Sequence, residues 1–332
     1  MTTSVALCTY NGEKYIYTQL ESIIKQSVHV DEIIICDDGS KDNTRAIIED
    51  FIQTTTIPIK LICNSINLGY TRNFEKAICQ CSGDIILLSD QDDVWLPDKV
   101  AIILDFFTKN PDKDFVFTNA QLINQSGLAS YKTTLFDVLQ WTKKNKKLVD
   151  KGYSYDILSL SGRVTGATTA LRASFIPYCI PFPQTTISAV HDEIIAVIAS
   201  ITNKIGYIDQ CLIQYRIHGQ QSVGLGWLFK YAPKNWECSY DNLMWHEDLI
   251  ELYNSELLAK MQFIHKRFWI LRSRGCVVKF LHMYISGEYH QFYQFPLSVF
   301  LRDIKSIVIR IFEKIRIIPK YRFLLKEEYY SM

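Results

Sequence analysis

Short apolar segments alternate with helix-like segments through the first hundred residues of this chain of 332 residues. The apolar segments are rich in β-branched residues, and turn signals or polar residues follow them. This alternation predicts an α/β fold with a doubly wound, mostly parallel sheet. We expect strands over residues 4–9, 32–36, 59–63 and 85–88, and helices over residues 13–26, 42–52 and 71–79.

Polar side chains follow three of these predicted strands at the point where each strand ends. The carboxyl ends of parallel strands meet at one edge of a sheet, and open α/β folds bind their ligands there. We therefore expect these side chains to line one crevice. They are Thr9, Tyr10, Asn11, Asp37, Asp38, Asp90, Gln91, Asp92 and Asp93.

Three of these residues, Asp90, Asp92 and Asp93, are carboxylates that follow the apolar run 85–88 within five positions. Such carboxylates repel one another, and a hard divalent cation with a preference for oxygen ligands relieves the repulsion. The pattern therefore fits Mg²⁺ or Mn²⁺ held against a diphosphate. Taken alone, it also fits a solvated acidic turn before a helix that starts near Pro97.

Two residues, Asp37 and Arg72, are candidates for nucleotide binding. The chain has neither the glycine fingerprint of a dinucleotide fold nor a phosphate loop. Asp37 instead offers an acceptor for the N3–H of a pyrimidine, with the Thr9 region nearby, although a helix-capping turn explains Asp37 equally well. Arg72, which begins a helix after Gly69, either contacts a diphosphate or covers its own helix.

Charge and cysteine content exclude several classes of protein. Lys plus Arg (36) nearly balance Asp plus Glu (35), so no global charge favours nucleic acid as a partner. The nine cysteines are scattered without a Cys-x-x-Cys pair, which argues against a disulfide framework or zinc site and for a reducing cytosol. We expect a cytoplasmic protein without a signal peptide or a transmembrane helix.

Four motifs together resemble the family 2 glycosyltransferases of GT-A fold, over about the first 220 residues. The last of them most resembles a rhamnosyltransferase-like bacterial branch, whose enzymes build surface polysaccharides from nucleotide sugars. The motifs are Thr9-Tyr10-Asn11-Gly12, Asp37-Asp38-Gly39-Ser40, Asn67-Leu68-Gly69 with Arg72-Asn73, and Ser89-Asp90-Gln91-Asp92-Asp93-Val94-Trp95-Leu96-Pro97-Asp98-Lys99.

The resemblance also implies roles for individual residues. It makes Asp192 the general base, although simple helix capping explains this acid too, and it makes His218 a donor-side or metal ligand with Asp92 and Asp90. On the acceptor side it implies Thr165, Gly166, Ala167 and His191, the last where many relatives carry Glu. For the nucleotide sugar it implies Thr9, Tyr10, Asn11, Asp37, Arg72, Asp90, Gln91 and Asp93.

The activity implied is transfer of a sugar, with inversion, from dTDP-rhamnose or a UDP-sugar to a hydroxyl of a bacterial surface-polysaccharide acceptor. The acceptor would be a glycan or a lipid-linked glycan, and Mn²⁺ or Mg²⁺ would stabilise the leaving diphosphate. The alternative is a non-catalytic nucleotide-sugar-binding or scaffold protein of a polysaccharide assembly complex. A processive synthase is disfavoured, because the chain has no Gln-x-x-Arg-Trp motif.

The later part of the chain carries weaker signals. We expect a catalytic domain over residues 1–225 and a helical region over 226–332, which offers a surface for homo-oligomer formation. Residues 101–108 predict a helix, and 114–119, 204–207 and 211–216 predict strands. The lysine-rich segment 131–151 predicts a solvated loop, with contact to an anionic acceptor as the alternative. The helix expected over 296–318 has an apolar face and a basic flank, and either contacts the inner membrane surface or packs on protein.

Overall fold

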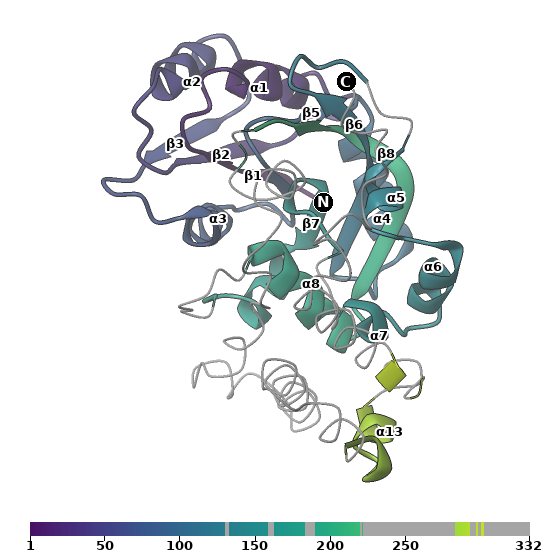
Figure 1. Ribbon diagram of the computed structural model, residues 1–332. Coiled ribbons are helices and arrows are strands. Elements are labelled where there is room, and N and C mark those ends of the chain that lie inside the picture. The colour runs from purple at the N-terminus through teal and green to yellow at the C-terminus, as the bar shows by residue number, and fades with distance from the viewer. Residues whose placement is uncertain are drawn as a thin grey trace, which may run out of the picture. The chain divides into compact units, whose positions relative to one another are not determined.

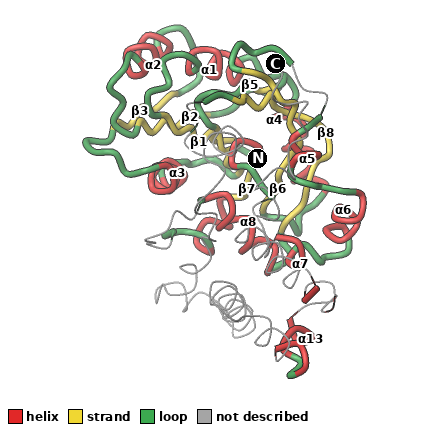
Figure 2. Tube along the Cα trace, viewed as in Figure 1, coloured by secondary structure: helices red, strands yellow, loops and turns green. Residues whose placement is uncertain are grey.

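The computed structural model describes residues 1–129, 133–158, 163–182, 190–219, 221, 283–292, 297 and 300–301. Residues Met1–His218 form one compact unit, and the chain after them belongs to a separate one. The first unit is a mixed sheet of eight strands with helices packed against it (Figures 1 and 2). The division into domains at residue 225 stays a prediction, because most of the later segment lies outside the described residues.

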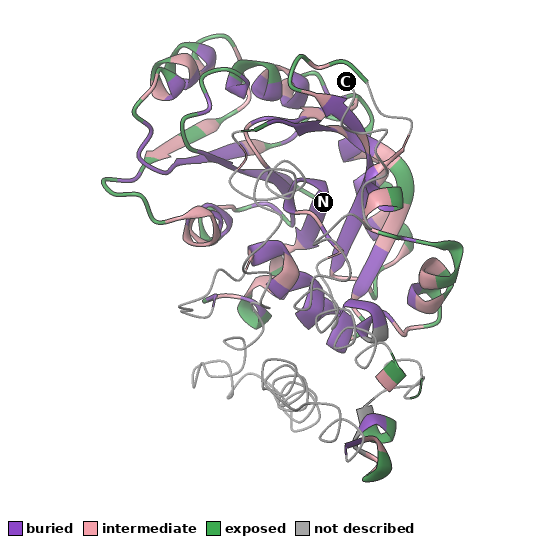
Figure 3. Cartoon of the chain, viewed as in Figure 1, coloured by how far each residue is buried: buried purple, intermediate pink, exposed green. Residues whose placement is uncertain are grey.

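The first part of the chain confirms the predicted alternation of strands and helices. Residues of β1, β2 and β4 are almost all buried, as unbroken apolar runs require in a sheet covered on both faces (Figure 3). Helices α1 and α2 lie on one side of this part of the sheet and α3 on the other (Figure 1). The elements are β1 (Thr3–Thr9), α1 (Ile16–Ile24), β2 (Glu32–Asp37), α2 (Thr44–Ile52), β3 (Ile59–Cys63), α3 (Tyr70–Cys79) and β4 (Ile85–Ser89).

The second part of the chain extends the same sheet with longer strands and short helical turns. Its elements are β5 (Val94–Trp95), α4 (Lys99–Lys109), β6 (Phe115–Asn124), α5 (Leu135–Val138), α6 (Lys143–Asp150), α7 (Tyr155–Leu158), a 3₁₀ turn (Gly166–Thr168), β7 (Thr169–Arg172), a second 3₁₀ turn (Ala173–Tyr178), α8 (His191–Ile201) and β8 (Ile205–Ile217). The described residues of the separate C-terminal unit include α13 (Glu288–Phe292).

The strand order is β3-β2-β1-β4-β7-β6-β8-β5. Strands β1 to β4 pair with one another in parallel, and β6 and β8 also pair in parallel. The antiparallel pairings are those of β7 with β4 and β6 and of β5 with β8. In the parallel part, Cys8 stands opposite Cys36, so the ends of β1 and β2 are level and their following loops are neighbours. The predicted α/β class with a mostly parallel sheet is confirmed.

Two predictions for the second part of the chain are wrong in detail. The strands expected over 204–207 and 211–216 are one strand, β8, since register shifts opposite Asn119 accommodate the exposed Asp209 and Gln210. The strand expected to end at Asn119 runs on to Asn124 as β6, because its second half pairs with the second half of β8.

The segment 131–151 is not the solvated loop that its lysines suggested. Its described residues form α5 and α6, and Trp141 between them is only 4 % exposed. The Trp141 ring packs against Phe117 of β6, 4.7 Å between centroids, and its Nε1–H donates to the Arg163 carbonyl at 2.7 Å. A few apolar contacts therefore hold a segment that is rich in lysine.

The helix predicted over 296–318 lies almost entirely outside the described residues, which include only 297, 300 and 301 of it. Within the part of the chain that the structure describes, no helix combines the length and the apolar character that crossing a bilayer requires.

Candidate functional site

The carboxylate-rich turn after β4 is bound to the loop after β1 through Gln91. The Gln91 Oε1 accepts from the Thr9 hydroxyl at 2.6 Å and from the Tyr10 backbone N–H at 2.8 Å. Gly12 lies against the same amide, since a Cβ built on it would stand 2.2 Å from Gln91 Oε1. The two strand-end loops therefore lie side by side, as the parallel pairing of β1 and β4 predicts.

Strand β8, in the second part of the same sheet, also binds this turn. The Arg216 backbone N–H donates to Asp93 Oδ1 at 2.9 Å, and its Nε–H donates to the Asp92 carbonyl at 2.6 Å. Two residues later, the Nε2 of His218 lies 2.7 Å from Asp92 Oδ2, and its ring packs on Tyr15 at 5.0 Å. The predicted association of His218 with Asp92 is thus present in the geometry.

Negative charge accumulates in this turn. Burial, followed by repulsion from Asp92, raises the pKa of Asp90 to about 7 and that of Asp93 well above its ordinary value. Asp93 Oδ2 is buried and has no hydrogen-bond partner among the described residues. A bound cation would lower the raised pKa values of Asp90 and Asp93, because it favours the ionised carboxylates, and it would offer a partner to Asp93 Oδ2.

The metal set expected from sequence is only partly assembled. Asp92 and His218 form a close pair, but the described residues contain no group of three His, Cys, Asp or Glu side chains arranged to hold a cation. Asp90 therefore does not join the pair as a third ligand in this structure. The pair would supply one carboxylate and one imidazole to a cation, an incomplete donor set that further oxygen ligands would have to complete for Mn²⁺ or Mg²⁺.

Lys99 is the last residue of the fourth sequence motif, which predicted no role for it. It is fully buried at the start of α4, donates from Nζ to the Ala167 carbonyl at 2.9 Å and lies 3.9 Å from the Trp95 ring centroid. Burial lowers its pKa to about 7 against the attraction of Asp93 and Asp90. The sequence held one indication of a role for Lys99. A positive charge in the first turn of a helix is unfavourable next to the helix dipole, so a lysine at this position suggests a specific contact.

Asp192 lies in the first turn of helix α8. Its Oδ2 accepts from the Gly166 N–H at 2.6 Å, and its Oδ1 accepts from the Glu193 N–H at 2.7 Å. Burial first, and then repulsion from Glu193, raises the pKa of Asp192 to about 8, with a smaller contribution from Asp90. A carboxyl with a raised pKa is a stronger base once it has lost its proton.

His191 stands beside Asp192 and against the same glycine. Its ring stacks on Phe74 of α3 at 3.9 Å with an interplanar angle of 22°, and burial lowers its pKa to about 3. A Cβ on Gly166 would stand 2.7 Å from His191 Nε2, so a residue larger than glycine does not fit at position 166 unless the His191 ring moves. The predicted acceptor-side residues Thr165, Gly166, Ala167 and His191 thus lie together near Asp192.

Asp37 has a full set of contacts within its own turn. It is completely buried and accepts from the backbone N–H groups of Gly39 and Ser40, from the Ser40 hydroxyl and from Arg45 Nε at 2.6 Å. These contacts stabilise the turn that follows β2 and cap no helix, since α2 begins only at Thr44. The contact of Asp37 to a pyrimidine base stays a prediction. The neighbouring Asp38 binds the loop before α3 through the N–H groups of Leu68 at 2.8 Å and Gly69 at 2.9 Å.

Arg72 and Asn11 are also engaged within the protein. Arg72 forms an ion pair with Glu75 on the same helix at 2.5 Å, which fits the helix-covering interpretation, and its contact to a diphosphate stays a prediction. Asn11 has a positive φ of 50° and accepts from the Lys41 N–H at 2.8 Å. Between Thr9 and Asn11, the Tyr10 side chain remains 43 % exposed at the rim of the site.

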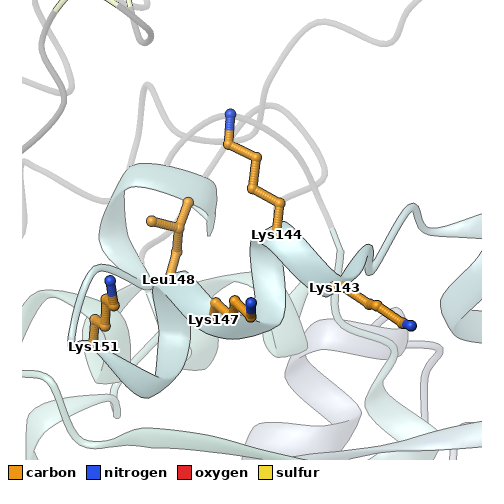
Figure 4. Close-up of a pocket in the computed structure, with 5 residues that line it drawn as sticks. All are labelled: Lys143, Lys144, Lys147, Leu148 and Lys151. Carbon is orange, nitrogen blue, oxygen red and sulfur yellow. The ribbon is translucent and has the colours of Figure 1, made fainter.

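Lysines of α6 and of its C-cap position, Lys151, form a separate basic surface. With one leucine, they line an open pocket of about 400 Å³ (Figure 4), and none of the predicted site residues lines it. Lys146, on the same helix, instead forms an ion pair with Asp209 of β8. The lining residues are Lys143, Lys144, Lys147, Leu148 and Lys151.

Comparison with known proteins agrees with this architecture. The family model "Glycosyl transferase family 2" matches residues 4–168. The dTDP-rhamnosyl transferase RfbG of Shigella flexneri is 32 % identical over 245 residues, which cover 69 % of this chain and 77 % of RfbG. The UDP-Glc:alpha-D-GlcNAc-diphosphoundecaprenol beta-1,3-glucosyltransferase WfgD of Escherichia coli is 30 % identical over 125 residues, which cover 38 % of this chain and about half (48 %) of WfgD.

Among solved structures, S. aureus TarS 1-349 in complex with UDP-GlcNAc superimposes with a TM-score of 0.55. The match covers 93 % of this chain and 81 % of that one at 17 % identity, which shows the fold and nothing further. The fold is of GT-A type, as the motifs implied. The chain belongs to the family 2 glycosyltransferases.

Proposed function

We propose that the protein is an inverting, metal-dependent glycosyltransferase that moves a sugar from a nucleoside diphosphate to a hydroxyl of a surface-polysaccharide acceptor. The observation that carries the proposal is the proximity of two acid groups with different surroundings. Lys99, at the end of the motif that contains Asp90, donates to the Ala167 carbonyl, and the neighbouring Gly166 N–H donates to Asp192. One backbone segment therefore connects the acid turn with Asp192.

On the donor side, Asp92 and His218 would hold Mn²⁺ or Mg²⁺, with Asp90 as a further candidate ligand. When bound, the cation acts as a Lewis acid on the leaving diphosphate. The protein's own part is to keep the acid turn in place, through Gln91 from the β1 loop and through Arg216 from β8.

On the acceptor side, Asp192 would accept the proton of the attacking hydroxyl. The Gly166 and Glu193 N–H groups fix its two oxygens, so the carboxylate is oriented before the acceptor arrives. With Asp192 as the base and the acid turn as a separate site for the leaving group, a covalent sugar–enzyme intermediate would be unnecessary. Direct displacement at the anomeric carbon then inverts its configuration.

The relatives' names support the choice of substrates. RfbG is named for dTDP-rhamnose, and WfgD for UDP-glucose and a diphosphoundecaprenol-linked acceptor. We therefore propose dTDP-rhamnose or a UDP-sugar as the donor and a glycan or lipid-linked glycan as the acceptor. A cytoplasmic location, membrane contact through residues 296–318 and homo-oligomer formation remain predictions.

The test uses purified full-length protein with dTDP-rhamnose, UDP-glucose and UDP-GlcNAc, with and without Mn²⁺ or Mg²⁺. We expect one donor to raise the melting temperature only with metal and to be hydrolysed slowly without acceptor. Asp92→Ala should abolish both effects, whereas Asp105→Ala, an exposed acid on α4, should retain them. Donor binding without any turnover would favour the scaffold alternative. The absence of both binding and turnover would contradict the proposal.

A further inference from the structure

Four exposed lysine side chains surround one open pocket, and none of them has an ion-pair or hydrogen-bond partner among the described residues. With Leu148 they line the cavity of about 400 Å³ that Figure 4 shows. The acid on the same helix, Asp150, forms no ion pair with them in this part of the chain, and its Oδ2 accepts from the Tyr207 hydroxyl at 3.4 Å. The four residues, named the α6 lysine surface, are Lys143, Lys144, Lys147 and Lys151.

The stability of the helix does not explain this arrangement. Helices α1 and α4 each contain an exposed lysine that pairs with an acid four positions before it. In α6, by contrast, Lys143 and Lys147 are four positions apart, and so are Lys147 and Lys151. Like charges at this spacing repel one another, and the positive charges of Lys143 and Lys144 in the first turn are unfavourable next to the helix dipole. The lysines therefore weaken the isolated helix.

Other side chains hold α6 against the protein. Trp141, just before the helix, and Val149 within it are buried, at 4 % and 5 % exposed. Lys146, which does not line the pocket, forms an ion pair with Asp209 of β8. Because these contacts anchor the helix, the α6 lysine surface remains exposed and can meet a partner from solution.

The chemistry of the surface favours mobile phosphate groups. Its lining consists of ammonium groups and one aliphatic side chain, without an aromatic ring, an arginine or a carboxylate. An ammonium group is a compact charge on a flexible stem, so it binds phosphate without a fixed geometry. Nucleic acids are recognised largely through aromatic rings that stack on bases and arginines that form paired hydrogen bonds. The surface therefore fits an array of phosphates better than a nucleic acid.

We propose that the α6 lysine surface binds the phosphate headgroups of an anionic membrane leaflet. Clusters of four or more basic residues on a helix are attracted to anionic lipids, and each lysine near the membrane strengthens binding about fivefold. The whole chain has a net charge of only +1, so the attraction belongs to this surface and not to a generally basic protein. The contact depends neither on the proposed sugar transfer nor on the contact expected through residues 296–318.

The test measures binding of the full-length protein to sedimented vesicles of phosphatidylcholine, with and without an equal part of phosphatidylglycerol. Each mixture is used at about 0.1 M and about 0.5 M NaCl, because salt screens contacts between exposed charges. Duplex DNA and alginate are measured in parallel as soluble anionic polymers. One triple variant combines Lys143→Gln, Lys144→Gln and Lys147→Gln, and a second carries Arg at the same positions. The matched control replaces three exposed lysines of α1, β3 and α4 by Gln: Lys25, Lys60 and Lys109.

We expect wild type to bind the anionic vesicles at the lower salt concentration, and to lose most of this binding at the higher one or without phosphatidylglycerol. The Gln variant of the α6 lysine surface should bind about 100-fold more weakly, as three losses of about fivefold each predict. The Arg variant retains the charge and should bind within about threefold of wild type, and so should the control. All variants should melt within about 3 °C of wild type, because the replaced side chains are exposed.

Several results would overturn the membrane contact. They are a wild type that does not bind the anionic vesicles, a Gln variant that loses less than about tenfold in affinity, and a control that loses as much as the Gln variant. Tighter binding of wild type to DNA or alginate than to the vesicles would also overturn it, as would a large fall in the melting temperature of the Gln variant. Vesicle binding requires neither donor nor metal, so a protein that binds vesicles without transferring sugar contradicts the proposed function alone.

Discussion

Replacing Asp192 by Asn should make the protein more stable than wild type at neutral and alkaline pH. The pKa of Asp192 is about 8 in the folded protein against an ordinary value of 3.8, so the folded state favours the protonated carboxyl. The stabilising contribution of that proton is complete below pH 3.8 and is lost as the pH rises through about 8. Asparagine stays neutral at every pH and does not lose this contribution.

The size of the effect follows from the same shift. Each pKa unit corresponds to about 1.36 kcal/mol, so the roughly three units between the ordinary pKa and pH 7 give about 4 kcal/mol as an upper bound. Asparagine has one acceptor oxygen for the two N–H donors of Gly166 and Glu193, which costs about 1 kcal/mol. We expect Asp192→Asn to be about 3 kcal/mol more stable than wild type at pH 7.

The assay is urea unfolding at pH 4.5, 6 and 8 without metal or nucleotide, with sugar transfer and donor binding measured on the same preparations. The stability difference should grow with pH, while the variant loses transfer and keeps its Kd for the donor. Asp50→Asn, at an exposed position on α2, should show no such growth. A difference in unfolding free energy between Asp192→Asn and wild type that stays constant with pH would refute the raised pKa of Asp192. A loss of donor binding in the variant would refute the role of Asp192 as the base.

Three further substitutions test the arrangement around the site. Lys99→Met removes the donor to a buried carbonyl and the cation near two acids, so it should destabilise the protein by about 2–4 kcal/mol in urea unfolding. The exposed Lys25→Met should change stability by less than about 0.5 kcal/mol, and equal effects would contradict the reasoning. Gly166→Ala places a methyl group 2.7 Å from His191 Nε2 and should lower the free energy of unfolding by about 1–3 kcal/mol. An unchanged melting temperature would show instead that the His191 ring moves aside. Asp38→Ala removes the acceptor for the amides of residues 68 and 69, whose hydrogen exchange should accelerate at least about tenfold; unchanged exchange would show that this loop is held elsewhere.

The positions of the first elements were predictable because their signals are local. An apolar run of five to seven residues that ends in polar residues marks a buried strand wherever its partners lie. The predicted strand over 59–63 matches β3, and those over 4–9 and 32–36 match β1 and β2 to within a residue. Helix ends were predicted less well, as in α1, which starts at Ile16 rather than at residue 13, after an irregular turn.

The order of the strands was not readable in the same way. The four-residue β7 pairs antiparallel with β4 and β6, and so joins the parallel part of the sheet to its second part. Its sequence, TALR, resembles many loop segments, and its pairing is with residues more than fifty positions away. Similarly, the basic composition of residues 143–150 predicted a solvated loop, whereas they form helix α6, and the nearby Trp141 is buried in the core.

For the site, the sequence by itself determined which chemical groups are available and which loops present them. The acids after β4, the Gly166 segment and Asp192 are local motifs, and the motif resemblance ordered them into a donor side and an acceptor side. Tertiary structure decided what each group can do, because pairing and burial depend on segments far apart in the chain. His218 meets Asp92 across 126 positions, and burial gives Asp192, Lys99 and His191 pKa values that no local sequence encodes.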